Sequence, residues 1–116
     1  MTDNTNIFVT GANGRMGKQI IRLIIDDPDL HLAGAVEHPD CPVLGADAGL
    51  NAESMAVSVT INHDLKRALE KSSGVIIDFS SVDSSLDTIR RAVEFKTPMV
   101  IGTTGFTSEE RKQIKE

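Results

Sequence analysis

The stretch of sequence that decides the fold reads V-T-G-A-N-G-R-M-G, at residues 9–17. It stands between a short apolar run at residues 7–9 and a helix-like repeat of apolar residues. A glycine-rich turn between a strand and a helix indicates a phosphate-binding loop, because the helix N-terminus attracts anions. The glycine spacing is G-x-x-G-x-x-G, one residue longer in its first gap than the dinucleotide fingerprint. The alternative is a glycine-rich turn that binds no ligand.

Each of the three glycines has its own predicted role. Gly11 allows a sharp exit from the strand, and Gly14 lets backbone N–H groups approach a pyrophosphate. Gly17 allows the helix to pack closely on the sheet. The loop therefore predicts the geometry of a nucleotide site as well as its position in the chain.

Composition and charge narrow the class of protein. The chain has 116 residues, enough for one domain but few for a complete dinucleotide enzyme. Its net charge is −5, its Lys and Arg residues are scattered, and it has no Trp or Tyr for base stacking, so we expect no nucleic-acid partner. No apolar run approaches the roughly 20 residues of a membrane span, and nothing resembles a signal peptide. We expect a cytoplasmic protein without membrane contact.

The cysteine and histidine content predicts neither a disulfide nor a metal site. Cys41 is the single cysteine, and no Cys/His cluster has the spacing of metal ligands. The three histidines, His31, His38 and His63, have no serine, cysteine or carboxylate spaced to form an evident catalytic group. We predict surface or capping roles for His31 and His63.

Alternation of strand and helix patterns predicts an α/β fold with a doubly wound parallel sheet, which is Rossmann-like. Strands are expected at residues 7–9, 30–36, 57–61, 74–79 and 98–101. Three helices are expected between them, with a long segment of weak order at residues 38–54. The predicted buried stripes are Met16, Ile20, Leu23 and Ile24; then Leu65, Ala68 and Leu69 after a cap at Asn62; then Leu86, Ile89 and Val93.

Ligands of such sheets lie outside the carboxyl ends of the strands. Glu37 follows the second predicted strand and lies 20 residues after Gly17, where an acidic residue hydrogen-bonds the adenosine ribose. Asp78 and Phe79 stand at the end of the fourth predicted strand, and a second small-residue loop at residues 102–105 follows the fifth. Each of these has a plain alternative as a solvated or capping residue. Together they predict one dinucleotide site at one edge of the sheet.

Cofactor choice depends on the residues around the ribose. A carboxylate such as Glu37 favours NAD, since it repels a 2′-phosphate, whereas a nearby arginine permits NADP. The residue after Glu37 is His38, and Arg15 on the glycine loop is within reach of a 2′-phosphate. We hypothesise that both cofactors bind and that NADH is preferred.

These motifs, in their order and spacing, resemble dihydrodipicolinate reductase (4-hydroxy-tetrahydrodipicolinate reductase) of bacterial lysine biosynthesis, over nearly the whole chain. The matching segments are the glycine loop at residues 11–17, Glu37, G-A-D-A-G at residues 45–49, D-F-S at residues 78–80 and V-I-G-T-T-G-F at residues 100–106. The resemblance implies NAD(P)H-dependent hydride transfer to a cyclic unsaturated dicarboxylate in the diaminopimelate pathway, by an enzyme that is usually a homotetramer.

The resemblance also implies which residues bind. The pyrophosphate would lie against residues 11–16, Glu37 would hold the adenosine ribose, and the nicotinamide would lie near residues 102–104, with Thr104 also near substrate. The implied cofactor-binding set is Gly11, Ala12, Asn13, Gly14, Arg15, Met16, Glu37, Gly102, Thr103 and Thr104. Many family members have an arginine where this chain has His38, so the contact to a 2′-phosphate is left open.

The family's catalytic His-His and Lys segment and its Ser-Gly-Thr substrate loop have no counterpart in these 116 residues. We therefore expect residues 1–116 to form one NAD(P)-binding domain, without the family's C-terminal substrate domain and inactive alone, with no catalytic residue of its own. Two alternatives remain: another NAD(P) reductase with a glycine loop, or a non-catalytic module that binds a nucleotide or coenzyme A.

Overall fold

The computed structural model describes residues 5–80 and 82–102. Its elements alternate along the chain, which confirms the predicted α/β class. They are β1 (Thr5–Thr10), α1 (Arg15–Asp26), β2 (Leu30–Val36), α2 (Ala48–Asn51), β3 (Ile61–Asn62), α3 (Leu65–Lys71), β4 (Val75–Asp78), α4 (Val82–Glu94) and β5 (Met99–Ile101).

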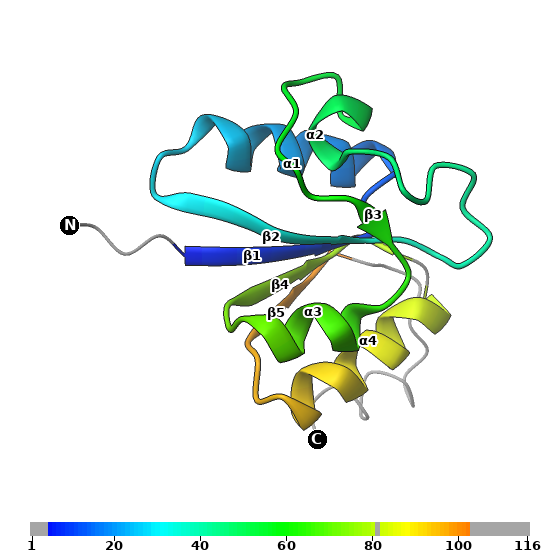
Figure 1. The fold of residues 1–116 in the computed structure, drawn as a ribbon. Coiled ribbons are helices and arrows are strands. Elements are labelled where there is room, and N and C mark those ends of the chain that lie inside the picture. Colours follow the sequence, from blue (N-terminus) through cyan, green and yellow to red (C-terminus); the bar gives the residue numbers. More distant parts are fainter. Residues whose placement is uncertain (1–4, 81, 103–116) are drawn as a thin grey trace.

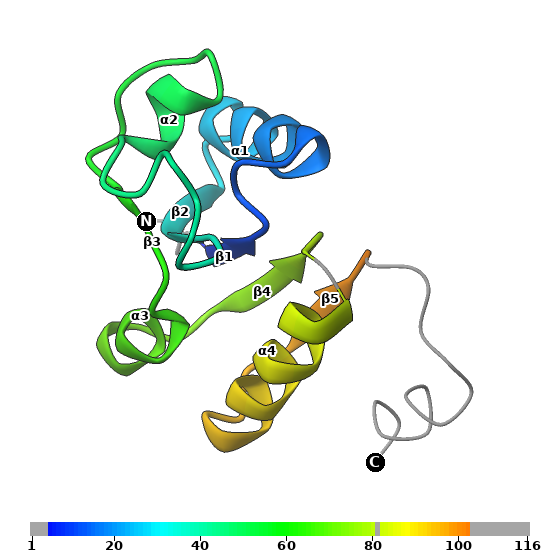
Figure 2. The same ribbon diagram turned by 90° about the vertical axis from the view of Figure 1, so that its right-hand side faces the viewer.

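The five described strands form one parallel sheet in the order β3-β2-β1-β4-β5. Helices α1 and α2 cover one face of this sheet, and α3 and α4 cover the other (Figure 1). From β1 the chain adds β2 and β3 on one side and then β4 and β5 on the other. The neighbouring strands β1 and β4 therefore form the switch point, where doubly wound folds bind ligands. Figure 2 views the sheet from its carboxyl end, where the connections that follow the strands converge.

Strand register places the strand ends level with one another. Thr10 pairs with Val36 on one side and with Asp78 on the other, and Asp78 in turn pairs with Ile101. The next residues along the four strands are Gly11, Glu37, Phe79 and Gly102. The predicted row of polar and glycine residues at the carboxyl edge is therefore present in the fold.

Alternating side chains of β1 belong to two different cores. Ile7 and Val9 pack with Ile21 and Ile24 under α1, whereas Phe8 points to the opposite face and packs with Leu65 and Leu69 of α3. A strand buried on both faces has a continuous apolar sequence, as β1 does at residues 7–9. The described part of the chain contains no helix long and apolar enough to cross a membrane.

The predicted buried stripe of α1 is right for two of its four residues. Ile24 is buried and Ile20 packs against the core, whereas Met16 is 44% and Leu23 is 64% exposed, and Gly17 and Ile21 are buried in their place. Gly17 lies against the turn at Gly11, and this contact sets the rotation of the helix about its axis. Successive residues are about 100° apart around a helix, so with Gly17 and Ile21 turned inward Met16 and Leu23 face outward.

The predicted stripe of α4 is partly wrong for a related reason. Ser85, Thr88 and Ala92 are buried, whereas Leu86 and Ile89 are only half-buried and Val93 is 69% exposed. These small side chains let α4 lie close to the sheet, where a buried carboxylate takes a hydrogen bond from Ser85. The face of α4 that is buried is therefore the one that can hydrogen-bond this carboxylate, and not the one with the larger apolar side chains.

The third strand is shorter and later than predicted. It comprises Ile61–Asn62 in place of residues 57–61, with an isolated bridge from Thr60 to Asp47. The N–H groups of Val57 and Ser58 donate to the Asp47 carboxylate and so take no part in the ladder. Asp64, and not Asn62, caps α3. Within residues 38–54, where weak order is predicted, the chain forms α2 and several backbone hydrogen bonds.

Candidate functional site

A cavity of about 900 Å³ opens at the carboxyl edge of the sheet, beside the switch point between β1 and β4. Its volume falls within the roughly 300–1,000 Å³ of small-molecule and cofactor sites. Residues that follow β1, β2 and β4 line one part of it, and the first turns of α3 and one side of α4 line the rest. The lining includes Thr10, Gly11, Gly14, Glu37, His38, His63, Lys66, Phe79, Ser80, Asp87 and Arg91.

The shape of the glycine loop depends on two very close backbone contacts. Gly11 has a φ of +76°, and a Cβ at this position would lie 2.6 Å from the carbonyl oxygen of Phe79. A Cβ on Gly17 would lie 2.1 Å from the carbonyl oxygen of Gly11. Gly14 has an extended backbone, with φ of −74°, and lines the cavity. The structure thus agrees with a turn role for Gly11 and a packing role for Gly17.

The N–H groups of the loop itself already have partners within the fold. Those of Gly11 and Ala12 donate to the carbonyl of Val36 at 2.9 and 3.2 Å, and that of Gly14 donates to the carbonyl of Gly11 at 3.0 Å. The Asn13 N–H donates to Glu37 Oε2 at 2.8 Å. These bonds fasten the loop to the end of β2, so the donors offered to a ligand are those of the first turn of α1.

The first turn of α1 is suited to an anion. Its N–H groups have no partners within the helix, and the N-cap residue Gly14 has no side chain to satisfy them. The first turn contains no acidic residue and carries Arg15. The positive end of the helix dipole and this arginine therefore act together at one helix terminus.

Glu37 lies at the rim of the cavity with its carboxylate fixed by two backbone donors. Oε2 accepts the Asn13 N–H at 2.8 Å, and Oε1 accepts the N–H of His38 at 3.0 Å. Each carboxylate oxygen has a further lone pair, so both can still accept a hydroxyl from a ligand. The neighbouring His38 imidazole lies 3.6 Å from a carboxylate oxygen of Asp40.

A buried carboxylate lies between the glycine loop and α4. Asp78 is fully buried, and its oxygens accept hydrogen bonds from the hydroxyls of Thr10, Ser80 and Ser85. Oδ1 also accepts the Ser80 N–H at 3.2 Å. Two of these partners, Thr10 and Ser80, line the cavity. The Asp78 network therefore fixes the cavity wall at the switch point.

The ring of Phe79 lies against Gly102, the residue that follows β5. A Cβ on Gly102 would lie 2.0 Å from Cε1 of Phe79, and the Gly102 N–H donates to the carbonyl of Asp78 at 2.7 Å. Gly102 thus makes room for a ring that lines the cavity. Thr103 and Thr104 lie outside the described residues.

The structure brings together only part of the set implied by resemblance. Gly11, Gly14 and Glu37 line the cavity, whereas the described residues Ala12, Asn13, Arg15, Met16 and Gly102 do not. Arg15 is exposed. Ala12 is fully buried beneath the loop, and Asn13 supports Glu37. Gly14, which lines the cavity, is the N-cap residue directly before the first turn of α1.

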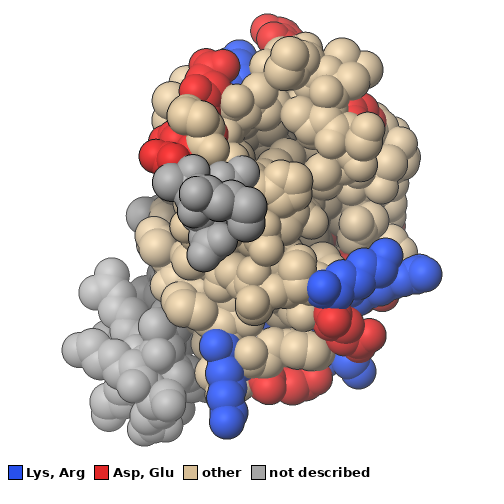
Figure 3. Space-filling view, turned by 60° about the vertical axis from the view of Figure 1, so that its left-hand side comes forward, with Lys and Arg blue, Asp and Glu red and all other residues tan. Residues whose placement is uncertain are grey.

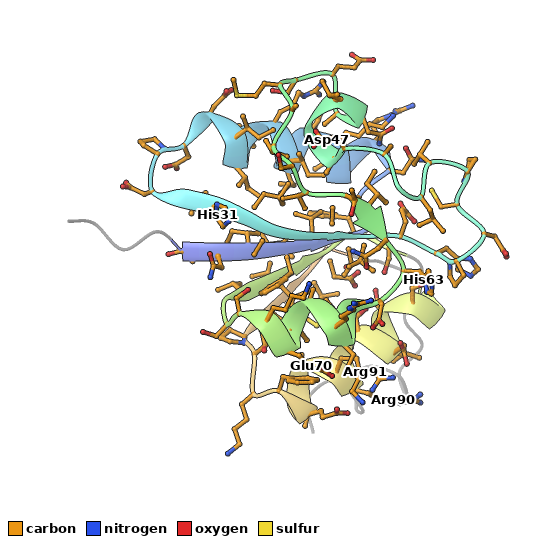
Figure 4. All side chains as sticks on the ribbon, viewed as in Figure 1. His31, Asp47, His63, Glu70, Arg90 and Arg91 are labelled. Atoms are coloured by element: carbon orange, nitrogen blue, oxygen red, sulfur yellow. The ribbon has the colours of Figure 1, made fainter. Side chains whose placement is uncertain are left out.

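Sequence reasoning missed the wall of the cavity formed by α3 and α4. His63, Asp64 and Lys66 come from the start of α3, and Asp87, Thr88 and Arg91 come from α4. Right-handed crossovers place both helices on the same face of the sheet. This rule could have predicted that α3 and α4 lie beside the cavity. Figure 4 shows His63 near the carboxyl end of the sheet and His31 toward the other end, so these two histidines do not meet.

Charge on the visible surface is mixed. On the face drawn in Figure 3, basic side chains occupy separate places, some with acidic side chains beside them, and uncharged residues cover most of the area between. Among the described residues, no group of three or more His, Cys, Asp or Glu side chains is placed to hold a metal ion.

Comparisons with known proteins agree with the fold and the motifs. Residues 5–116 match the family model described as dihydrodipicolinate reductase, N-terminus. A 4-hydroxy-tetrahydrodipicolinate reductase from Syntrophotalea carbinolica is 42% identical over 110 residues, which are 95% of this chain and 41% of that protein. The reductase of Methanothermobacter thermautotrophicus is 36% identical over 113 residues, with 95% and 41% covered. The chain thus spans about two fifths of the length of these relatives.

A solved structure is also similar. The dipicolinate-bound dihydrodipicolinate reductase from Paenisporosarcina sp. TG-14 superposes with a TM-score of 0.70 and 20% identity, over 96% of this chain and 42% of that one. At this identity the match supports the fold alone. The sequence matches are stronger, and they show that the chain belongs to the dihydrodipicolinate reductase family, matching the N-terminal part of its members.

Proposed function

We propose that residues 1–116 form the NAD(P)H-binding domain of a reductase that transfers hydride to a cyclic unsaturated dicarboxylate of the dihydrodipicolinate type, in diaminopimelate and lysine biosynthesis. The observation that carries this proposal is the position of Glu37. Its fixed carboxylate lines a cavity that Gly11 and Gly14 of the glycine loop also line, Gly14 being the N-cap residue of α1. Family membership favours this proposal over another reductase or a coenzyme A module.

The residues present fit a dinucleotide. The first-turn N–H groups of Arg15 and Met16 would hold the pyrophosphate, next to Gly14, which has no side chain to block the approach. Glu37 would accept the ribose hydroxyls. Phe79 lines the cavity and would contact the cofactor beyond the pyrophosphate. The bound cofactor would supply the hydride, while this chain binds and orients it.

The proposal is tested by titrating the chain with NADH and following nicotinamide fluorescence. The Glu37→Ala variant loses the acceptor for two ribose hydroxyls, each hydrogen bond to a charged group being worth about 1.5–3 kcal/mol. We expect at least a tenfold loss of NADH affinity. Unchanged affinity would contradict a ribose role for Glu37 and would favour a ligand without a ribose diol, such as coenzyme A.

We also propose that NADH is preferred over NADPH, although both bind. Glu37 would repel a 2′-phosphate, and the carboxylate of Asp40 lies beside the neighbouring His38. Arg15 is exposed at the start of α1 and is the candidate partner for the extra phosphate. The Arg15→Ala variant should weaken NADPH binding more than NADH binding, and unchanged NADPH affinity would remove Arg15 from this role.

For turnover, we propose that the 116-residue chain alone is inactive, because the motifs that the family uses for proton donation have no counterpart in it. The cavity wall of the described residues supplies binding groups and fixed hydroxyls. Substrate-dependent oxidation of NADH by this polypeptide in a steady-state assay would contradict this proposal.

A further inference from the structure

Helix α2 makes a direct hydrogen bond to the glycine loop. The side-chain amide of Asn51 donates to the side-chain oxygen of Asn13 at 3.0 Å, in a partly buried contact between residues 38 apart in sequence. The backbone N–H of Asn13 is the donor that Glu37 accepts at 2.8 Å. Asn13 therefore stands between α2 on one side and the Glu37 carboxylate on the other.

Helix α2, which carries Asn51, is held in place by several contacts. Asp47 caps α2 by accepting the Leu50 N–H at 3.0 Å, and it also accepts the N–H of Ser58 at 2.8 Å. Ala48 and Ala52 at the two ends of the helix are fully buried. A Cβ on Gly49 would lie 1.9 Å from the carbonyl oxygen of Met55, so the chain passes very close there. The G-A-D-A-G segment at residues 45–49 thus fixes the position of the Asn51 backbone.

Helix α2 is also attached to α1. The guanidinium of Arg22 donates to the carbonyl of Ala52 at 3.4 Å. Helix α2 therefore contacts both the glycine loop, which lines the cavity, and the helix that follows this loop. A movement of α2 would therefore shift or break the hydrogen bond from Asn51 to Asn13.

We propose that Asn51 is a positioning residue for the dinucleotide: it holds the side chain of Asn13, so that the Asn13 N–H keeps the Glu37 carboxylate aimed at the ribose. This inference rests on the proposed function. It assigns a task to the G-A-D-A-G segment, which anchors Asn51 without lining the cavity itself. Neither asparagine needs to touch the cofactor.

The first test is a double-mutant cycle on NADH affinity. Loss of one neutral hydrogen bond is worth about 1 kcal/mol, so Asn51→Ala should weaken NADH binding about fivefold. Asn13→Ala should give a similar loss, and the double variant should lose no more than either single variant. In a Glu37→Ala background, Asn51→Ala should change NADH affinity little, because the group it positions is gone.

The matched control is Asn6→Ala. Asn6 also donates its side-chain amide across the fold, to the carbonyl of Ser73 at 3.0 Å, but at the opposite end of β1 from the cavity. This variant should keep the NADH affinity of the parent chain. A loss as large as that of Asn51→Ala would mean that affinity reports general stability, and it would overturn the inference.

A second test needs no cofactor. Amide hydrogen exchange of the free chain should be faster at the Asn13 N–H in Asn51→Ala than in the parent or in Asn6→Ala. If Glu37→Ala weakens NADH binding while Asn51→Ala changes neither the affinity nor this exchange rate, the positioning role is wrong and the proposed function stands. If the parent chain binds no NADH, both are overturned.

Discussion

The two loops that leave the middle of the sheet reach the same cavity by different means. The loop after β1 is shaped by the absence of side chains, with Gly11 and Gly17 allowing backbone contacts that a Cβ would prevent. The connection after β4 is shaped by side chains, with the Asp78 carboxylate binding three hydroxyls. The two meet where Thr10 donates to Asp78 and where Gly11 lies against the backbone of Phe79.

This difference shows where each loop can tolerate change. In the first loop the partners are backbone atoms, which cannot move without moving a strand or a helix. In the second loop the partners are rotatable hydroxyls, which can reorient when a neighbour changes. Substitutions in the first loop should therefore cost more than substitutions in the second.

The largest effect is expected for Gly17→Ala. The added methyl would lie 2.1 Å from the backbone oxygen of Gly11, so α1 must move away from the loop. We expect a loss of about 3 kcal/mol in the free energy of unfolding, as for severe overpacking, together with loss of NADH binding. Urea unfolding and NADH titration measure the two effects.

Gly14→Ala is the matched control within the same loop. Its Cβ would lie 3.3 Å from the Gly11 oxygen, and its φ is compatible with alanine. We expect less than about 1 kcal/mol of lost stability but weaker NADH binding, since Gly14 lines the cavity. Equal destabilisation by the two substitutions would show that backbone proximity is not what distinguishes these glycines.

The next largest effect is expected at the second loop. Asp78→Ala would leave three hydroxyls in a buried site without their shared acceptor, which should cost about 2 kcal/mol of stability. Asp78→Asn keeps the volume and one acceptor oxygen, so it should cost about half as much. If Asn costs as much as Ala in urea unfolding, the hydroxyls do not reorient and the contrast between the two loops fails.

The sequence predicted the first loop better than the second, and the contrast explains why. The backbone geometry of the first loop requires glycine at fixed positions and Glu37 at a fixed interval after Gly17. Such spacings can be recognised in the sequence. The parallel sheet followed from the same alternation of patterns. The hydroxyl cluster around Asp78 has no fixed spacing, because Thr10 and Ser85 reach it from different elements.

The same reasoning accounts for the wrong helix faces. Hydrophobicity selected Leu23 and Val93, which are exposed, because it takes no account of how closely a helix approaches the sheet. Gly17 in α1 and Ser85 in α4 set that approach. The α3 and α4 wall of the cavity depends on tertiary packing, so no local pattern predicted it.

The smallest effect is expected at Asp47, a carboxylate whose partners, unlike those of Asp78, are backbone N–H groups. The N–H of Leu50 above all, with those of Val57, Ser58 and Gly49, holds the pKa of Asp47 below its ordinary value. Because the pKa is lowered in the folded state, the stabilisation is present at neutral pH and is lost as pH falls through that lowered pKa.

Asp47→Asn removes this stabilisation at every pH, so its difference from the parent should depend on pH. The parent should unfold at higher urea concentration than Asp47→Asn at pH 7, and the two midpoints should approach each other as pH falls below about 4. A difference that stays constant down to pH 3 would mean that the charge of Asp47 contributes nothing. The segment that carries Asn51 would then be held by the buried Ala48 and Ala52 and by hydrogen bonds that do not involve Asp47, such as that from the Ala48 N–H to the carbonyl of Val59.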